Sequence, residues 1–178
     1  NNVGVGSSTL AAVTSGSYNI AVGNDVLREN TTGGYNTASG NRSLFSNTTG
    51  AQNTASGQDA LYSNTEGHYN TASGRQSLYN NTTASNNVAL GYQASYTNAT
   101  GTPNTAVGYQ ALYANVASNN TATGYQSLYT NTTGYSNTAI GHLAYKSNTT
   151  GATSTAVGFG ALYTNTTGIN GTAVGAEA

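Results

Sequence analysis

Hydrophobic and small residues recur along this chain with a 17-residue period. A five-residue signature of the form Asn-Thr-Ala-Val-Gly, as at 104–108, occurs in eleven copies. The signature glycines follow this period at every step except the one from Gly108 to Gly124, which is shorter by a single position. A period held over so many copies predicts a solenoid, in which each repeat packs only against its neighbours. The signature glycines are Gly6, Gly23, Gly40, Gly57, Gly74, Gly91, Gly108, Gly124, Gly141, Gly158 and Gly175.

The centre of the signature is always a small residue. Alanine stands two positions before the glycine in ten copies, and Gly4 stands there in the first. The signature has the short, β-branched character of a strand. We therefore expect the signature to form a strand in each repeat, with backbone or a neighbouring chain close to its central residue. This structural ladder includes Ala38, Ala55, Ala72 and Ala106.

A second ladder of apolar residues is expected four positions after the glycine. Leucine occupies that position in most copies, and an aromatic residue usually follows it. The segment Ala-Leu-Tyr is expected to supply a second short strand, with its leucine facing the interior. The ladder leucines include Leu44, Leu61, Leu78, Leu112, Leu128 and Leu162.

A turn is predicted after each aromatic residue. The sequence there is Asn-Thr-Thr-Gly or a relative, and Asn and Gly both tolerate positive φ. Two strands and two turns make one coil. The pattern thus predicts an all-β fold, a parallel β-solenoid of about eleven 17-residue coils that spans 1–178 as a single repeat domain. With strands about 4.8 Å apart, the rod would be roughly 50 Å long.

Composition excludes several classes of function. Charged residues make up 5% of the chain, and the net charge is −1. The four basic residues are dispersed, so no patch for nucleic acid is expected. No apolar run approaches the roughly 20 residues of a membrane span, so no membrane insertion is expected.

No catalytic or metal site is apparent, and we expect the chain not to be an enzyme. His68 and His142 lie at different repeat positions and lack ligand-spaced partners, so no metal or other cofactor is predicted. Asp25 and Asp59 share a repeat position two coils apart, or roughly 10 Å. Because no third group tunes this pair, we interpret both as solvated carboxylates.

The signature resembles the head repeats of YadA-type trimeric autotransporter adhesins, through the segments 104–108, 137–141 and 154–158. The longer repeat, with Ala-Leu-Tyr and Asn-Thr-Thr-Gly, looks like repeats of tail-fibre-like proteins. The resemblance implies a left-handed β-roll, three chains packed side by side as a homotrimer, and a place on a cell surface or virion surface.

The predicted function is that of a structural fibre or adhesin segment, an extracellular rod that displays or carries receptor-binding surfaces. We expect it to be part of a longer fibre. The partners would be copies of the chain itself and a glycan or protein of a host surface. One alternative is a self-assembling filament subunit, since uncapped end coils invite further strand pairing. Another alternative is an ice-binding β-solenoid, because threonine recurs in columns.

Two sets of residues are candidates for contact or modification. The aromatic residues directly after the signature glycine are candidates for receptor or glycan contact. The turn asparagines lie in Asn-X-Ser/Thr sequons and are candidate glycosylation sites if the chain enters a glycosylating secretory pathway. The contact candidates are Tyr92, Tyr109, Tyr125 and Phe159. The glycosylation candidates are Asn30, Asn47, Asn81, Asn98, Asn131, Asn148 and Asn165.

Overall fold

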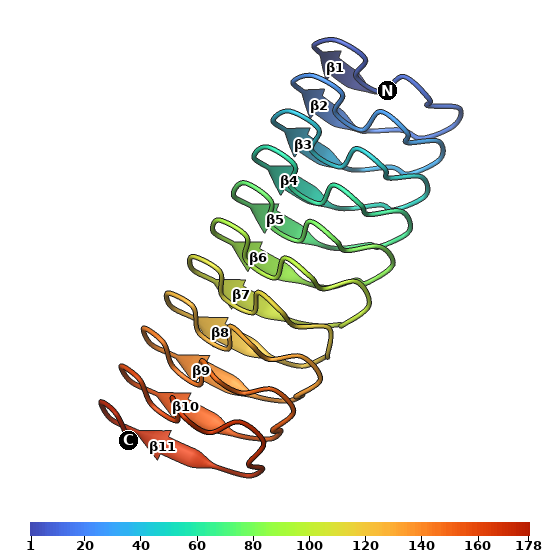
Figure 1. The fold of residues 1–178 in the computed structure, drawn as a ribbon. Helices are drawn as coiled ribbons and strands as arrows, with labels where there is room; N and C mark the ends of the chain where they lie inside the picture. Colours follow the sequence, from blue (N-terminus) through green and yellow to red (C-terminus); the bar gives the residue numbers. More distant parts are fainter.

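The computed structural model describes residues 1–178 as a rod of stacked coils with the two termini at opposite ends (Figure 1). Eleven short parallel strands form one sheet, and each pairs only with the strands next to it in sequence. This confirms the predicted parallel β-solenoid. The strands are β1 (Val3–Val5), β2 (Ile20–Val22), β3 (Thr37–Ser39), β4 (Thr54–Ser56), β5 (Thr71–Ser73), β6 (Val88–Leu90), β7 (Thr105–Val107), β8 (Thr121–Thr123), β9 (Thr138–Ile140), β10 (Thr155–Val157) and β11 (Thr172–Val174). We number the coils 1 to 11 in the same order.

The register places each signature residue beside its equivalent in the next coil. Ala38 of β3 pairs with Ala55 of β4, for example. Ala106 pairs with Ala122 in the same way, although the coil that connects them is the short one. That coil is shortened in its turn, so the strand register is unaffected.

The predicted second strand of each coil is wrong. The Ala-Leu-Tyr segments form turns, in which residues two and four positions after the signature glycine have positive φ, such as 53° at Arg42 and 50° at Leu44. Consecutive residues of a strand point to opposite faces, whereas Ala60 and Leu61 are both fully buried. Left-handed residues cost about 1 kcal/mol each. Hydrogen bonds between coils offset that cost, such as the one from Leu44 N to Ala60 O at 2.9 Å.

The interior contains the two predicted ladders. The central residues of β2 to β10 and most ladder leucines are almost completely buried, whereas Leu162 in coil 10 is half-buried. In coil 9 the leucine position is taken by Tyr145, which is also fully buried. Its hydroxyl donates a hydrogen bond to Gly168 O at 3.0 Å, so the irregular sequence of this coil fits the same architecture.

The signature glycine forms the corner between strand and turn. Gly108 has a φ of 132°, a backbone conformation that residues with a side chain rarely adopt. A Cβ atom added there would also collide with the carbonyl oxygen of Gly124 in the next coil. The close stacking of the coils therefore requires glycine at this corner. The fold has no helix that could cross a membrane.

Ser95 is a weak point of the core and yields a prediction. It occupies the leucine position of coil 6, is buried, and its hydroxyl has no hydrogen-bond partner. We expect Ser95→Leu to raise the free energy of unfolding by about 1–3 kcal/mol, because it removes an unpaired hydroxyl and buries apolar surface. Chemical denaturation would measure this change.

The reverse substitution is the matched control. Leu112→Ser, one coil further along, should lower the free energy of unfolding by about 2–5 kcal/mol. A Ser95→Leu variant no more stable than the original chain would contradict the proposed equivalence of the two positions.

Candidate functional site

Two ladders of buried asparagines run through most of the rod. The first is formed by the signature asparagine, the residue before each strand, and Ser154 replaces this asparagine in coil 10. In coil 3, Asn36 Nδ2 donates to Gly50 O at 2.9 Å, and Asn36 Oδ1 accepts from Asn53 N in the next coil at 3.0 Å. The side chain thus closes its own coil and connects it to the next one.

The second ladder is formed by the turn asparagine, the first residue of Asn-Thr-Thr-Gly. Asn47 Nδ2 donates to Asn30 Oδ1 in the preceding coil at 2.7 Å and to Gly50 O at 2.9 Å. Both ladders therefore meet at the carbonyl oxygen of the turn glycine. Amides satisfied in this way can occupy an interior too thin for a large apolar core. The second ladder lacks the amide–amide bonds on either side of Asn98.

The candidate glycosylation sites all belong to this second ladder. Six of the seven have side chains with no exposed surface, and Asn165 in coil 10 is half-buried. Because the Nδ2 atoms of the six buried residues donate hydrogen bonds in the interior, a glycan on these six is incompatible with this fold. The turn chemistry suggested exposed asparagines, and only their regular recurrence from coil to coil hinted at a ladder. The six buried residues are Asn30, Asn47, Asn81, Asn98, Asn131 and Asn148.

Aromatic residues form a column on the outside of the rod, which we call the tyrosine column. Adjacent rings from Phe45 to Tyr129 have centroids 5.1–5.2 Å apart and planes inclined by 5–16°. Burial raises the pKa of the Tyr79 phenol, and the neighbouring Tyr62 and the carboxylate of Asp59 add to this effect. The column contains Phe45, Tyr62, Tyr79, Tyr96, Tyr113, Tyr129 and Tyr163.

The four candidate contact residues lie together in a second column, the corner column, directly after the signature glycines. His142 completes this column between Tyr125 and Phe159, with ring centroids 5.1 Å from each. Tyr109 and Tyr125 are 44% exposed and Phe159 is 51% exposed. The other member is Tyr92, which stacks on Tyr109 at 5.2 Å.

Stacking limits what the corner column can bind. Because neighbouring rings cover one another's faces, mainly ring edges and hydroxyl groups reach solvent. A sugar ring that stacks on an aromatic face would find a free face only at the Phe159 end of the column, because Arg75 lies over Tyr92 at the other end. Contact with a receptor along the column would therefore have to use edges and hydroxyls.

Cations replace rings within the same columns. Lys146 takes the place of an aromatic residue in the tyrosine column, with Nζ 5.9 Å from the ring centroid of Tyr129 and 6.0 Å from that of Tyr163. Arg28 lies over Phe45 at the start of this column, and Arg75 lies over Tyr92 at the start of the corner column. These cations are engaged with rings along the rod and do not form a common patch.

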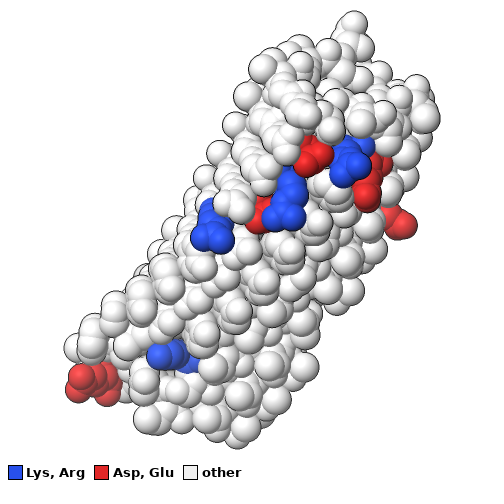
Figure 2. All heavy atoms as spheres, turned by 45° about the horizontal axis from the view of Figure 1, so that its top comes forward, with Lys and Arg blue, Asp and Glu red and all other residues white.

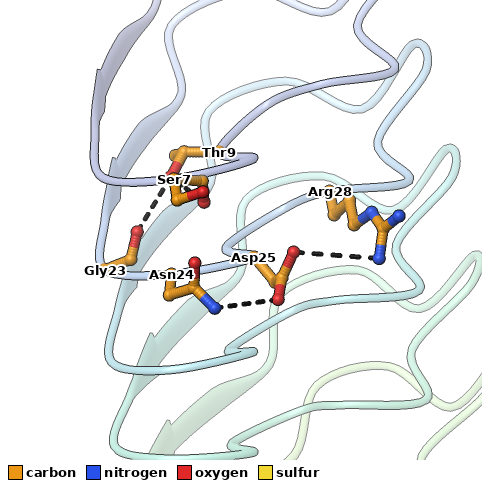
Figure 3. Close-up of polar contacts among 6 residues, drawn as sticks. All are labelled: Ser7, Thr9, Gly23, Asn24, Asp25 and Arg28. Carbon is orange, nitrogen blue, oxygen red and sulfur yellow. Dashed lines mark hydrogen bonds and ion pairs between the residues drawn. The ribbon is translucent and has the colours of Figure 1, made fainter.

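The two aspartates, Asp25 and Asp59, are paired with neighbouring arginines. Figure 3 shows Asp25 accepting a hydrogen bond from Asn24 Nδ2 at 2.9 Å and lying 3.7 Å from Arg28 Nη1. Asp59 Oδ1 lies 2.9 Å from Arg42 Nη2. Most of the few charged side chains gather toward one end of the rod (Figure 2), and no group of three or more possible metal ligands is present. Arg42 occupies the same repeat position in coil 3, so a cation lies between Asp25 and Asp59. Asp59 is buried, so its interpretation as a solvated carboxylate was wrong.

The outer face of the sheet is uncharged along its whole length. The residues on either side of each strand's central residue point outward, and none of them is charged. Val22, Ile140 and Val174 are 42%, 43% and 71% exposed. Eight strands begin with a threonine whose hydroxyl makes no hydrogen bond within the chain. These are Thr37, Thr54, Thr71, Thr105, Thr121, Thr138, Thr155 and Thr172.

A hollow lies beside the last coils. It is lined by Leu143, Phe159, Leu162, Tyr163 and Glu177, among others. It opens where Leu162 has no complete coil stacked upon it. Its lining contains no arrangement of titratable groups suited to catalysis.

Comparisons with protein-family models, with curated proteins and with solved structures found no match to this chain.

The asparagine ladder yields a prediction about stability. Asn64 Nδ2 donates to Asn47 Oδ1 at 2.7 Å and to Gly67 O at 3.1 Å. Asn64→Leu would leave buried polar partners unpaired, and we expect it to lower the free energy of unfolding by about 2–5 kcal/mol. Thermal and chemical denaturation would measure the loss.

The matched control is Asn41→Leu, because Asn41 is exposed and its side chain makes no hydrogen bond. That variant should stay within about 0.5 kcal/mol of the original chain. Equal effects of the two substitutions would show that the ladder contributes nothing specific.

Proposed function

We propose that this chain is a structural rod segment that associates side by side with copies of itself as a parallel homotrimer, within a fibre on a cell or virion surface. The observation that supports this proposal is the uncharged, partly apolar outer face of the eleven-stranded sheet. Soluble proteins rarely leave large apolar patches uncovered, and such patches often mark interaction sites.

The size of this face suits self-association. Two side chains per strand point outward, which gives 2 × 11 = 22 over the sheet. A strip as wide as these short strands and roughly 50 Å long offers several hundred Å² for each partner, close to the roughly 800 Å² of a standard interface. A thin rod also buries little surface on its own, so a shared core adds stability.

The order of residues along the face favours parallel packing about an axis along the rod. In that arrangement each coil meets its own copy in the partner. The apolar coil with Ile20 and Val22 then packs on itself, as does the coil with Ile140. The polar Thr-Ala-Ser strands of coils 3 to 5 likewise meet each other. An antiparallel arrangement in full overlap would instead place coils 3 and 5 against coils 9 and 7, whose strands present Ile140 and Val107.

End-to-end stacking into a filament is supported less well. Within residues 1–178, β1 and β11 each pair on one side only, and an unpaired strand edge can pair with another strand. However, Val13 stands at the turn-asparagine position of coil 1, and Gly171 stands at the signature-asparagine position before β11. A junction between these two coils would therefore interrupt both asparagine ladders.

A substitution on the sheet face tests the proposed trimer. Ile140→Lys places a charge at the shared interface, and we expect it to convert the trimer to monomers at micromolar concentration, because desolvating an unpaired cation is costly. Mass photometry would measure the mass, and circular dichroism would confirm that the rod remains folded.

Thr133→Lys is the control for the added charge, because Thr133 is exposed in a turn away from the sheet. That variant should remain trimeric. The proposal would be overturned if the original chain has the mass of a monomer, or if the Ile140→Lys variant keeps the mass of a trimer.

Ice binding is a second candidate, since the sheet's threonine hydroxyls are free to bond water and repeat at regular intervals on a parallel sheet. It requires this face to be open to solvent, so it competes with the trimer. If it is correct, the folded chain will show thermal hysteresis, and Thr121→Lys will abolish it whereas Thr133→Lys will not. If the original chain shows no thermal hysteresis, ice binding is excluded.

A further inference from the structure

We propose that the tyrosine column is a site of oxidative cross-linking, at which dityrosine bonds join neighbouring coils. The reaction requires an external one-electron oxidant that acts on tyrosine, such as a peroxidase with hydrogen peroxide. It concerns the run of five consecutive tyrosines in coils 4 to 8. These are Tyr62, Tyr79, Tyr96, Tyr113 and Tyr129.

The fold holds these rings beside one another before any reaction occurs. The four adjacent pairs have centroids 5.1–5.2 Å apart and planes inclined by 5–16°. The backbone next to each ring is bonded between coils, as from Ser63 N to Tyr79 O at 3.0 Å. Two reacting groups kept in contact by a scaffold behave as if at very high local concentration.

The composition of the chain directs oxidation to these side chains. The sequence has no cysteine, methionine or tryptophan, which would otherwise compete for a one-electron oxidant, but it has 14 tyrosines. The rings of the column are half-buried, so they remain accessible to an oxidant and can release the phenolic proton to water. Phe45 and Lys146, which flank the run, cannot form phenoxyl radicals.

The chemistry balances with the oxidant named above. Each of two adjacent tyrosines loses one electron to the oxidant and its phenolic proton to water, giving two phenoxyl radicals. Their ortho carbons form a carbon–carbon bond. The two hydrogens on those carbons then move to the phenolic oxygens, which restores both aromatic rings. The net loss is two electrons and two protons for each cross-link.

Cross-links of this kind would connect coils that are otherwise held together without covalent bonds. Each would close a loop the length of one coil, because the linked tyrosines occupy equivalent positions in successive repeats. Closing a loop restricts the unfolded chain, as a disulfide does. The chain has no cysteine, so this column offers a different route to the same constraint.

The test is oxidation of the folded chain at high dilution with photoactivated ruthenium tris-bipyridine and persulfate, followed by peptide mass spectrometry. We expect linked peptides that lack two hydrogen atoms and join tyrosines of adjacent coils. Tyr96→Phe keeps the stacked ring but eliminates two of the four tyrosine pairs, so the yield of cross-links within the column should fall to about half.

Tyr135→Phe is the matched control, because Tyr135 is 55% exposed and stacks on no other ring. It should leave the yield within the column unchanged. Three results would each overturn the proposal. The first is cross-links that form mainly through Tyr135, and the second is cross-links that form only between different chains. The third is a cross-link yield of the Tyr96→Phe variant equal to that of the original chain. Circular dichroism of both variants would confirm that they fold.

Discussion

Hydrogen bonds between successive coils hold this protein together, and they depend on a constant register. Of the 119 backbone hydrogen bonds, only 20 lie within the strands, so most of the backbone is bonded in turns and between turns. The buried asparagines extend this network into the interior, where they bond to carbonyl oxygens and to one another. Because such bonds join the same pair of repeat positions in coil after coil, a change in coil length is tolerated only where the turn can absorb it. The one short coil does so by shortening its turn between Asn115 and Ala117.

The same register determines the surface of the rod. A residue that repeats in sequence becomes a column in space, so the chemistry of each face follows from one repeat position. Aromatic positions give stacked rings, and cations such as Lys146 join those stacks instead of forming a patch. The outward positions of the strands give a long uncharged face. The interior is occupied by structural contacts, so recognition has to take place on these columns.

Much of this architecture could be predicted from the sequence, because the period alone specifies a solenoid and the small and leucine positions specify its ladders. The predicted second strand was wrong, because β propensity gave no sign of the left-handed conformations at Arg42 and Leu44. The turn asparagines were expected at the surface, since Asn-Thr-Thr-Gly is a typical turn sequence. Their burial follows from bonds between coils, which a single repeat does not reveal. Tyr145 could have been assigned to the core by counting four positions from Gly141.

The central claim is that both sets of asparagines form interior ladders, and exchange of their side-chain amide hydrogens tests it most directly. Nuclear magnetic resonance on the folded chain would follow the Nδ2 hydrogens of Asn47, Asn53 and Asn64 after transfer to deuterated water. The structure predicts protection comparable to that of the backbone amides in the central strands, because these groups are buried and bonded to the neighbouring coils. Exchange as fast as that of the exposed Asn41 side chain would contradict the ladders and the constant register that they require.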